Sequence, residues 1–137
     1  MENVVRVGVA VHIYKDGDIL LMKRIGELGN EKWCSPGGKM DIGETAVECG
    51  LRELNEEIGD NLVITKPEYY GITNDYFIKE NKHYITIHMI SEYISGEAEN
   101  KEPNKCSEIG WFDIREINKK DLFLPMLNYI DDNLIDE

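Results

Sequence analysis

The sequence predicts an α/β fold in which a mixed β-sheet lies between helices. Three observations lead to this prediction: β-rich segments lie on both sides of an amphipathic helix, a second helix follows late in the chain, and the composition is that of one globular domain. The chain has 137 residues and 42% of them are hydrophobic, which is enough for a single core. We therefore expect residues 1–137 to form one domain.

The first part of the chain reads as a β-hairpin followed by a loop. Residues 4–14 are rich in Val and Ile, residues 15–18 have turn composition, and residues 19–23 resume a strand. Glycine and Asn in residues 25–35 indicate a loop. Pro-Gly-Gly at 36–38 then predicts a tight, irregular backbone.

The central helix has a clear beginning, end and apolar face. Thr45 and Glu48 form the capping-box pattern T-x-x-E, and Gly59 suits the residue after the last turn. The spacing of four apolar residues at i, i+4, i+7 and i+11 predicts one stripe that faces a sheet. These residues are Val47, Leu51, Leu54 and Ile58.

The second half of the chain predicts further strands and a final helix. Strands are expected at 62–65, 69–78, 83–94 and 109–113, with a hairpin loop at 79–82 and a long acidic loop at 95–108. Pro125 suits the first position of a C-terminal helix. Its buried side would comprise Met126, Tyr129, Ile130 and Leu134, and residues 135–137 would fray.

Charge and cysteine content exclude several classes of protein. The net charge is −12, with 27 acidic against 15 basic residues, so a basic surface for duplex nucleic acid is not expected. A small phosphorylated ligand remains compatible, because a divalent cation can supply positive charge locally. No apolar run approaches a membrane span, and neither a signal peptide nor a CxxC pair occurs. We expect a cytoplasmic protein with reduced cysteines and no membrane partner.

Three carboxylates share one face of the central helix. At 100° per residue, Glu53, Glu56 and Glu57 fall within an arc of about 100°, and the apolar stripe is centred roughly 140° away. Like charges at i+3 and i+4 destabilise a helix, and anions near its C-terminus oppose the macrodipole. An arrangement that local energetics disfavours is typical of functional sites. A bound hard cation would turn the unfavourable interaction of the three carboxylates into a favourable one. The simpler interpretation is a solvated acidic face that Arg52 partly offsets.

The glycine pair before the helix favours the metal interpretation. Exposed carbonyls at Gly37 and Gly38 can ligate a metal, and their amides can approach phosphate. The fixed positions are Gly38, then Glu44 after five residues, Arg52-Glu53-Leu54 after seven more, and then Glu56, Glu57 and Gly59. This pattern resembles the Nudix box, GX5EX7REUXEEXGU, with Asp60 in place of the final bulky aliphatic residue.

The resemblance implies an α/β/α sandwich and a Mg²⁺-dependent hydrolase of nucleoside diphosphates linked to another group, with Mn²⁺ as an alternative metal. It makes Glu53, Glu56 and Glu57 metal ligands, together with the carbonyl of Gly37 or Gly38. Arg52 would orient Glu53, and Glu44 would support the junction of loop and helix. The resemblance implies a glutamate as general base, either one of the box residues or one on a later loop. On the acidic loop, Glu102 and Glu108 are the candidates, and Glu102 is also expected to reach the metal.

Segments outside the box extend the resemblance to nearly the whole chain. VGVAV, LLMKR, SPGGK, KENKHYITI, EPNKC, GWFDI and LFLPM resemble the short MutT-type nucleoside triphosphate pyrophosphatases, in the subgroup of plant and vertebrate members that sanitise nucleotide pools. The resemblance implies hydrolysis of nucleoside triphosphates, oxidised purines such as 8-oxo-dGTP included, to monophosphate and pyrophosphate. It also implies a base pocket formed by Cys34, Phe123, Leu124 and Met126.

Other residues have a functional and a plain structural interpretation. Trp33 can stack on a base or pack in the core, and Arg24 and Lys39 can contact phosphate or remain solvated. His12, His83 and His88 show no metal-ligand spacing, and we expect structural or surface roles for them.

Alternatives to the triphosphate substrate stay open. They are dihydroneopterin triphosphate, a nucleotide sugar, a capped RNA end, and a non-catalytic module that binds a nucleotide. A homodimer is also open, because related proteins are often dimers, although the sequence shows no interface signature.

Overall fold

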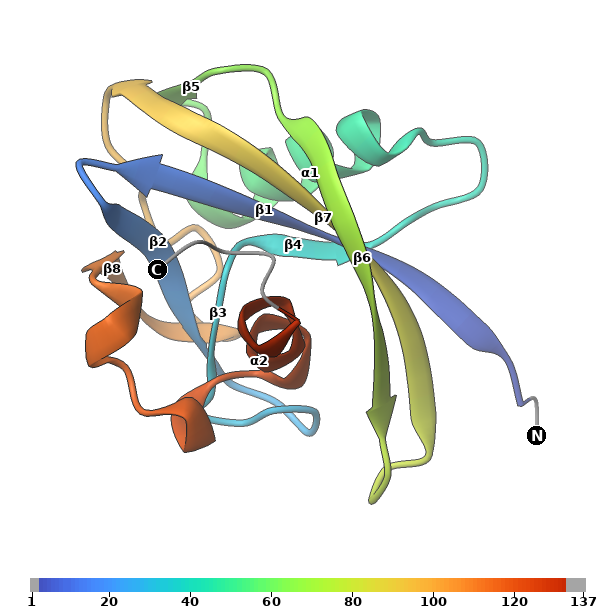
Figure 1. Ribbon diagram of the computed structural model, residues 1–137. Coiled ribbons are helices and arrows are strands. Elements are labelled where there is room, and N and C mark those ends of the chain that lie inside the picture. Colours follow the sequence, from blue (N-terminus) through green and yellow to red (C-terminus); the bar gives the residue numbers. More distant parts are fainter. Residues whose placement is uncertain (1–2, 133–137) are drawn as a thin grey trace.

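A mixed β-sheet with one α-helix on each face forms the protein (Figure 1). The computed structural model describes residues 3–132. The strands are β1 (Val5–Lys15), β2 (Asp18–Arg24), β3 (Trp33–Cys34), β4 (Gly37–Lys39), β5 (Val63–Ile64), β6 (Glu68–Phe77), β7 (Lys82–Ser95) and β8 (Cys106–Phe112). The helices are α1 (Ala46–Ile58) and α2 (Leu124–Asp131), with 3-10 turns at Ile114–Glu116 and Lys119–Asp121. The predicted fold class is confirmed. No helix among the described residues is long and apolar enough to span a membrane.

β1 lies at the centre of the sheet and has different partners along its length. It pairs in parallel with β7 from Val5 to Tyr14, but it pairs with β2 only at Tyr14 and Lys15. Further towards its N-terminus β1 separates from β2, and β4 pairs with Gly8, Val9 and Ala10 instead. The glycines of β4 therefore lie beside the middle of β1 and close to α1.

Two hydrophobic cores fill the two faces of the sheet. Side chains alternate along β1, so that Val11 and Ile13 pack towards α1 and His12 points to the other face, where it stacks on Tyr129 of α2. The α1 side holds Val9, Val11, Ile13, Leu20, Met22, Cys49, Leu54, Ile58, Met89 and Cys106. The α2 side holds Ile19, Leu21, Leu122, Met126 and Tyr129. Burial of each large apolar side chain contributes about 1.5–3 kcal/mol, so both layers stabilise the sheet.

Helix α1 has the predicted capping box but a different buried face. The Glu48 amide donates to the Thr45 hydroxyl at 3.2 Å, and the Thr45 amide donates to the Glu48 carboxylate at 2.9 Å. Leu51 is 46% exposed, so its assignment to the buried stripe is wrong. The helix instead approaches the sheet through Gly50, where an added Cβ would lie 2.9 Å from a Val11 methyl. A glycine contact of this kind leaves no signal in an apolar pattern.

Several boundaries differ from the prediction. Gly37 and Gly38 lie in the extended strand β4 and not in an irregular turn, and β3 interrupts the expected loop at 25–35. β8 begins at Cys106, because that residue pairs with Arg24 of β2, so the acidic loop is shorter than predicted. Pro125 takes the second position of α2, after Leu124. Leu134 and residues 135–137 lie outside the described part of the chain.

Candidate active site

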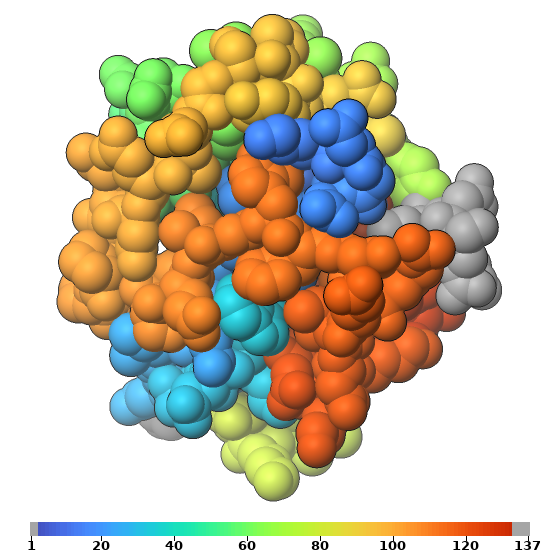
Figure 2. All heavy atoms as spheres, turned by 90° about the vertical axis from the view of Figure 1, so that its left-hand side faces the viewer, coloured from blue at the N-terminus to red at the C-terminus, as the bar shows by residue number. Residues whose placement is uncertain are grey.

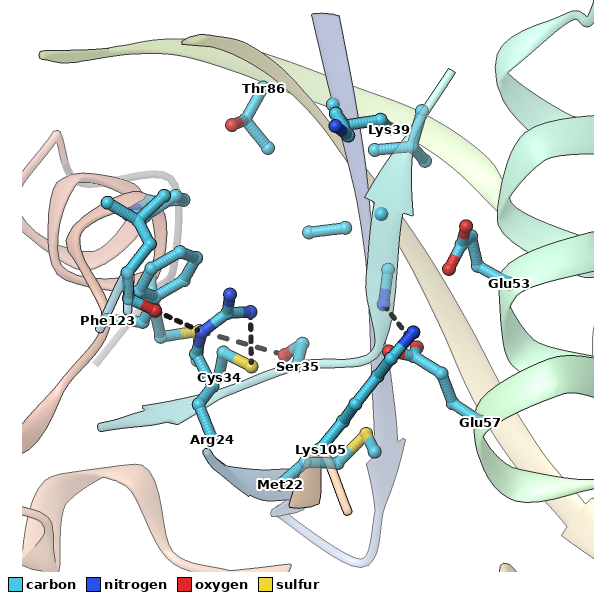
Figure 3. Close-up of a pocket in the computed structure, with 18 of the residues that line it drawn as sticks. Met22, Arg24, Cys34, Ser35, Lys39, Glu53, Glu57, Thr86, Lys105 and Phe123 are labelled. Atoms are coloured by element: carbon cyan, nitrogen blue, oxygen red, sulfur yellow. Dashed lines mark hydrogen bonds between the residues drawn. The ribbon is translucent and has the colours of Figure 1, made fainter. Parts of the chain in front are cut away.

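A cavity of about 470 Å³ opens between α1, the sheet and the start of α2. Figure 3 shows Glu53 and Glu57 of α1 on one side of it, Arg24 and Phe123 on the other, and Ser35 between them. The structure brings most of the predicted site residues to the wall of this cavity. They are Arg24, Cys34, Gly37, Gly38, Lys39, Glu53, Glu57, Glu102, Phe123 and Met126.

Two residues predicted for the base pocket do not line the cavity. Trp33 and Cys34 are neighbours in β3, so their side chains point to opposite faces, and only Cys34 reaches the cavity. The Trp33 ring packs against Phe112 at a centroid distance of 4.8 Å. Leu124 begins α2 and is also absent from the wall, whereas Phe123 just before it is present. The structure thus favours the packing interpretation of Trp33.

The two glutamates considered as general base lie in different places. Glu102 lines the cavity, and Lys105 approaches its carboxylate at 3.7 Å. Glu108 lies in β8 with a side chain 60% exposed, where it pairs with Lys23 at 3.7 Å. Figure 2 shows the gold to orange segment that carries Glu102 beside the blue loop after β2, and the Ile25 amide donates to the Lys105 carbonyl at 2.9 Å there. Glu102 is the better placed of the two.

Arg52 joins the loop before α1 to the carboxylates of the helix. Its guanidinium donates to Glu44 at 2.6 Å, to Glu53 at 2.8 Å and to Glu56 at 2.9 Å, and also to the Lys39 carbonyl at 3.1 Å. The hydrogen bond from Arg52, and then the one from the Asp41 amide, lower the pKa of Glu44 to about 2. Glu44, Arg52 and Glu56 lie outside the cavity wall, and Arg52 connects the other two to Glu53, which forms part of it.

Glu57 lies in an environment that resists ionisation. Burial raises its pKa to about 8, against the hydrogen bond that the Gly37 amide donates at 2.9 Å, and the charges of Glu53 and Glu102 raise the pKa further. Burial also raises the pKa of Glu53, although the hydrogen bond from Arg52 opposes this. A positive charge placed between these carboxylates would favour their ionised forms and so lower both pKa values.

The donor atoms of this end of the cavity suit a hard divalent cation. Carboxylate and main-chain carbonyl oxygens are the ligands that Mg²⁺ and Mn²⁺ prefer. A Cβ at Gly38 would lie 2.3 Å from the Glu53 carboxyl carbon, so only glycine leaves room for that carboxylate beside β4. Within residues 3–132, no group of three or more His, Cys, Asp or Glu side chains is already arranged around an ion position. Glu53 and Glu56 face Arg52 and Glu57 faces an amide, so side-chain rotation would have to accompany metal binding.

The two glycines of β4 offer a matched pair of mutations. In Gly37→Ala the new methyl would lie 2.0 Å from the Val9 carbonyl oxygen, so paired main chain must move and we expect a loss of about 3 kcal/mol in unfolding free energy. In Gly38→Ala the three atoms nearest to the new methyl belong to the movable carboxylate of Glu53, so the stability loss should be about 1 kcal/mol. Displacement of that carboxylate should nevertheless reduce hydrolysis about 100-fold. Urea unfolding measures the stability of both variants, and turnover assays measure their activity. A fully active Gly38→Ala protein would contradict the role of Glu53.

The other end of the cavity combines aromatic rings and a cation. The Arg24 guanidinium lies 3.9 Å from the centroid of the Phe123 ring, and its Nε donates to the Leu28 carbonyl at 3.1 Å. Phe77 of β6 packs on Phe123 at 5.3 Å, and Tyr84 of β7 also lines the wall. This end has the flat apolar surfaces on which a nucleobase stacks.

The sequence did not identify Ser35, Phe77, Tyr84 or Thr86 as lining residues. Alternation placed Thr86 on the opposite face of its strand from the neighbouring isoleucines, but the sequence does not show that α2 and the cavity lie on that face. His12 and His88, predicted to be structural, are completely buried and hydrogen-bonded to each other at 2.8 Å. Burial lowers the pKa of both rings, and that of His88 falls to about 4.

Comparison with known proteins agrees with the box and the fold. The NUDIX domain model matches residues 4–132. The Nudix hydrolase YvcI of Bacillus subtilis is 28% identical over 69% of this chain and 56% of its own length. An ADP-ribose pyrophosphatase of Methanocaldococcus jannaschii is 32% identical over 78% of this chain and 61% of its own length. The chain thus spans little more than half of these two relatives.

One further relative and one solved structure match over most of their own length. Nucleoside triphosphatase NudI of Enterobacter sp. is 27% identical over 80% of this chain and 83% of its own. The crystal structure of a MutT NUDIX hydrolase from Burkholderia pseudomallei has a TM-score of 0.77 and 28% identity, and the match covers 84% of this chain and 88% of that one. The sheet between two helices and the box on α1 define the class as that of the Nudix hydrolases. The chain belongs to the Nudix family and is of its MutT type.

Proposed function

We propose that this protein hydrolyses nucleoside triphosphates, deoxynucleotides and oxidised purines such as 8-oxo-dGTP included, to the monophosphate and pyrophosphate, with Mg²⁺ or Mn²⁺ as the metal. One observation carries the proposal. A single cavity has Glu53, Glu57 and Glu102 at one end and the Arg24–Phe123 stack at the other. The acidic end suits a metal-bound phosphate chain, and the aromatic end suits a base.

The proposed metal site is formed by the glutamates of α1 and the glycines of β4. Glu53, Glu56 and Glu57, with the carbonyl of Gly37 or Gly38, would hold the metal, and Arg52, which donates to Glu53 and Glu56, would orient Glu53. A bound divalent ion neutralises phosphate oxygens and lowers the pKa of a coordinated water.

Positioning and proton transfer fall to the rest of the cavity wall. Glu102, which lines the cavity, would take the proton from the attacking water, and Lys39, which lines it too, would be a cation for the phosphates. Holding the chain and the water in line then supplies much of the rate enhancement.

Removal of one carboxylate tests the proposed metal site. In Glu53→Gln or Glu56→Gln we expect Mg²⁺-dependent pyrophosphate release to fall at least about 100-fold, which corresponds to a barrier about 3 kcal/mol higher. Glu97→Gln, at an exposed position after β7, is the matched control and should retain activity. Full activity of either helix variant would refute the metal assignment.

An ADP-ribose or related diphosphate substrate is the second candidate, because a relative that is 32% identical bears the name ADP-ribose pyrophosphatase. The same cavity would accept a diphosphate with a sugar in place of the terminal phosphate. A panel of nucleotides, with the products identified, separates the two functions. Pyrophosphate plus monophosphate supports our proposal, whereas nucleoside monophosphate plus a sugar phosphate supports the alternative. The homodimer, the cytoplasmic location and the likeness to the plant and vertebrate subgroup stay predictions.

A further inference from the structure

A chain of buried hydrogen bonds begins at Ser35 in the wall of the cavity. The Ser35 hydroxyl is 2.7 Å from Nδ1 of His12, and Nε2 of His12 is 2.8 Å from Nδ1 of His88. Nε2 of His88 is 2.8 Å from the Thr73 hydroxyl, which donates to Asp75 at 3.2 Å. All five side chains belong to residues that are at most 6% exposed. The chain thus connects the cavity with a carboxylate that does not line it.

Only two directions of donation are open to this chain. A neutral imidazole has one nitrogen that donates and one that accepts, and a hydroxyl has a single proton. If the Ser35 hydroxyl donates to His12, every later group donates towards Asp75. If the chain runs the other way, His12 donates to Ser35, and the Ser35 proton is left to point elsewhere.

Asp75 decides the direction. Its carboxylate also accepts from Thr86 at 2.5 Å and from the Asn128 amide at 2.9 Å, so three donors converge on it. Hydrogen bonds to a carboxylate are roughly twice as strong as those between neutral groups. In the reverse direction Thr73 would give up this bond, and Ser35 would gain only the Met126 sulfur at 3.7 Å, which is a weak acceptor. Donation therefore runs from Ser35 to Asp75.

The direction determines what Ser35 offers to a ligand. Its proton is engaged with His12, which lines the same cavity, so the Ser35 oxygen has only lone pairs left to offer a ligand there. We propose that Ser35 is a specificity-determining residue that accepts a hydrogen bond from an N–H group of the substrate's base, and that Asp75 is the positioning residue that fixes this polarity from outside the cavity. The inference rests on the proposed function, since it assigns a base to this cavity. The protein should therefore prefer a nucleotide whose base carries an amino group over one that has an oxo group or a hydrogen at the same position of the base.

Pairs of nucleotides that differ at one position test the proposal. In dATP and dITP a 6-amino group is exchanged for 6-oxo, and dGTP and dITP differ by the 2-amino group. The full chain should favour the amino member of at least one pair by about tenfold in kcat/KM. Ser35→Ala should abolish this ratio. Asp75→Asn should abolish or invert it, because the new amide can donate to Thr73 and reverse the chain.

Matched variants separate polarity from general damage. Thr73→Val should interrupt the chain and lose the ratio, and Thr73→Ser should restore it. Ser91, a serine 3% exposed and outside the cavity wall, is the control. Ser91→Ala should lower stability without changing the ratio. A structural role alone would lower kcat for both members of a pair equally.

The outcomes distinguish this inference from the proposed function. If the protein releases pyrophosphate but shows no preference in either pair, or keeps its preference in Ser35→Ala and Asp75→Asn, the inference is overturned and the function stands. If no triphosphate is hydrolysed, the proposed function fails. In that case the affinities of the same nucleotide pairs are measured by calorimetry with Mg²⁺. The ratio of affinities within each pair, in the wild-type protein and in Ser35→Ala, then decides the role of Ser35.

Discussion

Glu57→Gln is expected to stabilise the metal-free protein at pH 8 while it abolishes hydrolysis. The folded protein keeps the Glu57 proton up to a pKa of about 8, whereas the unfolded chain loses it near 4.5. Between these values the folded state binds more protons, so stability falls as the pH rises. Over pH 5–8 this loss should be about 3 kcal/mol for the wild-type protein. A neutral glutamine does not titrate, so the variant should lack this loss.

Unfolding by urea at pH 5, 6, 7 and 8, with a chelator and then with Mg²⁺, measures the effect. Added metal should stabilise the wild-type protein more at pH 8 than at pH 5, and it should stabilise Glu57→Gln little at either pH. Glu97→Gln controls for the loss of one surface charge. An equal pH dependence of stability in Glu57→Gln and wild-type protein would show that Glu57 is not the group responsible.

The helix of the box was predictable because its signals are local. Thr45 and Glu48 are three residues apart, and the spacing of the glutamates along one helix determines which face they share. The match of Gly38, Glu44 and Arg52 to a known box then related the helix to the strand before it. Capping bonds and the Arg52 contacts follow from residues that lie within 15 positions of one another.

Contacts between distant segments were not predictable from such signals. His12 and His88 are 76 positions apart, and only the parallel register of β1 with β7 places them side by side. The close approach of Gly50 to Val11 explains why Leu51 faces solvent, yet a glycine adds nothing to an apolar pattern. The sequence left Trp33 either stacking on a base or packing in the core, and only strand β3, which was not predicted, puts it on the opposite face from Cys34.

The buried histidine pair is expected to make the protein sensitive to mild acid. Burial lowers the pKa of His88 to about 4, against 6.5 for an ordinary histidine, and lowers that of His12 as well. The histidine pair is surrounded by Ser35, Thr73 and Tyr129, and the carboxylate of Asp75 lies at the end of the chain of hydrogen bonds. These groups do not restore the pKa values of the two histidines. Between pH 6.5 and 4 the unfolded state binds more protons than the folded state, so the unfolding free energy decreases as the pH falls.

From pH 7 to pH 5, His88 alone should reduce the unfolding free energy by about 2 kcal/mol. His88→Gln should be less stable than wild-type protein at pH 7, because its amide replaces the ring imperfectly, but its stability should change less between pH 7 and 5. His83→Gln is the matched control, since His83 lies near the start of β7, away from the buried pair, and its Nε2 is hydrogen-bonded to the Asn74 side chain at 3.0 Å. Its acid dependence should equal that of the wild-type protein. Parallel stability profiles for wild-type protein and His88→Gln would refute the assignment, because the same fold would then lose stability in acid through other groups.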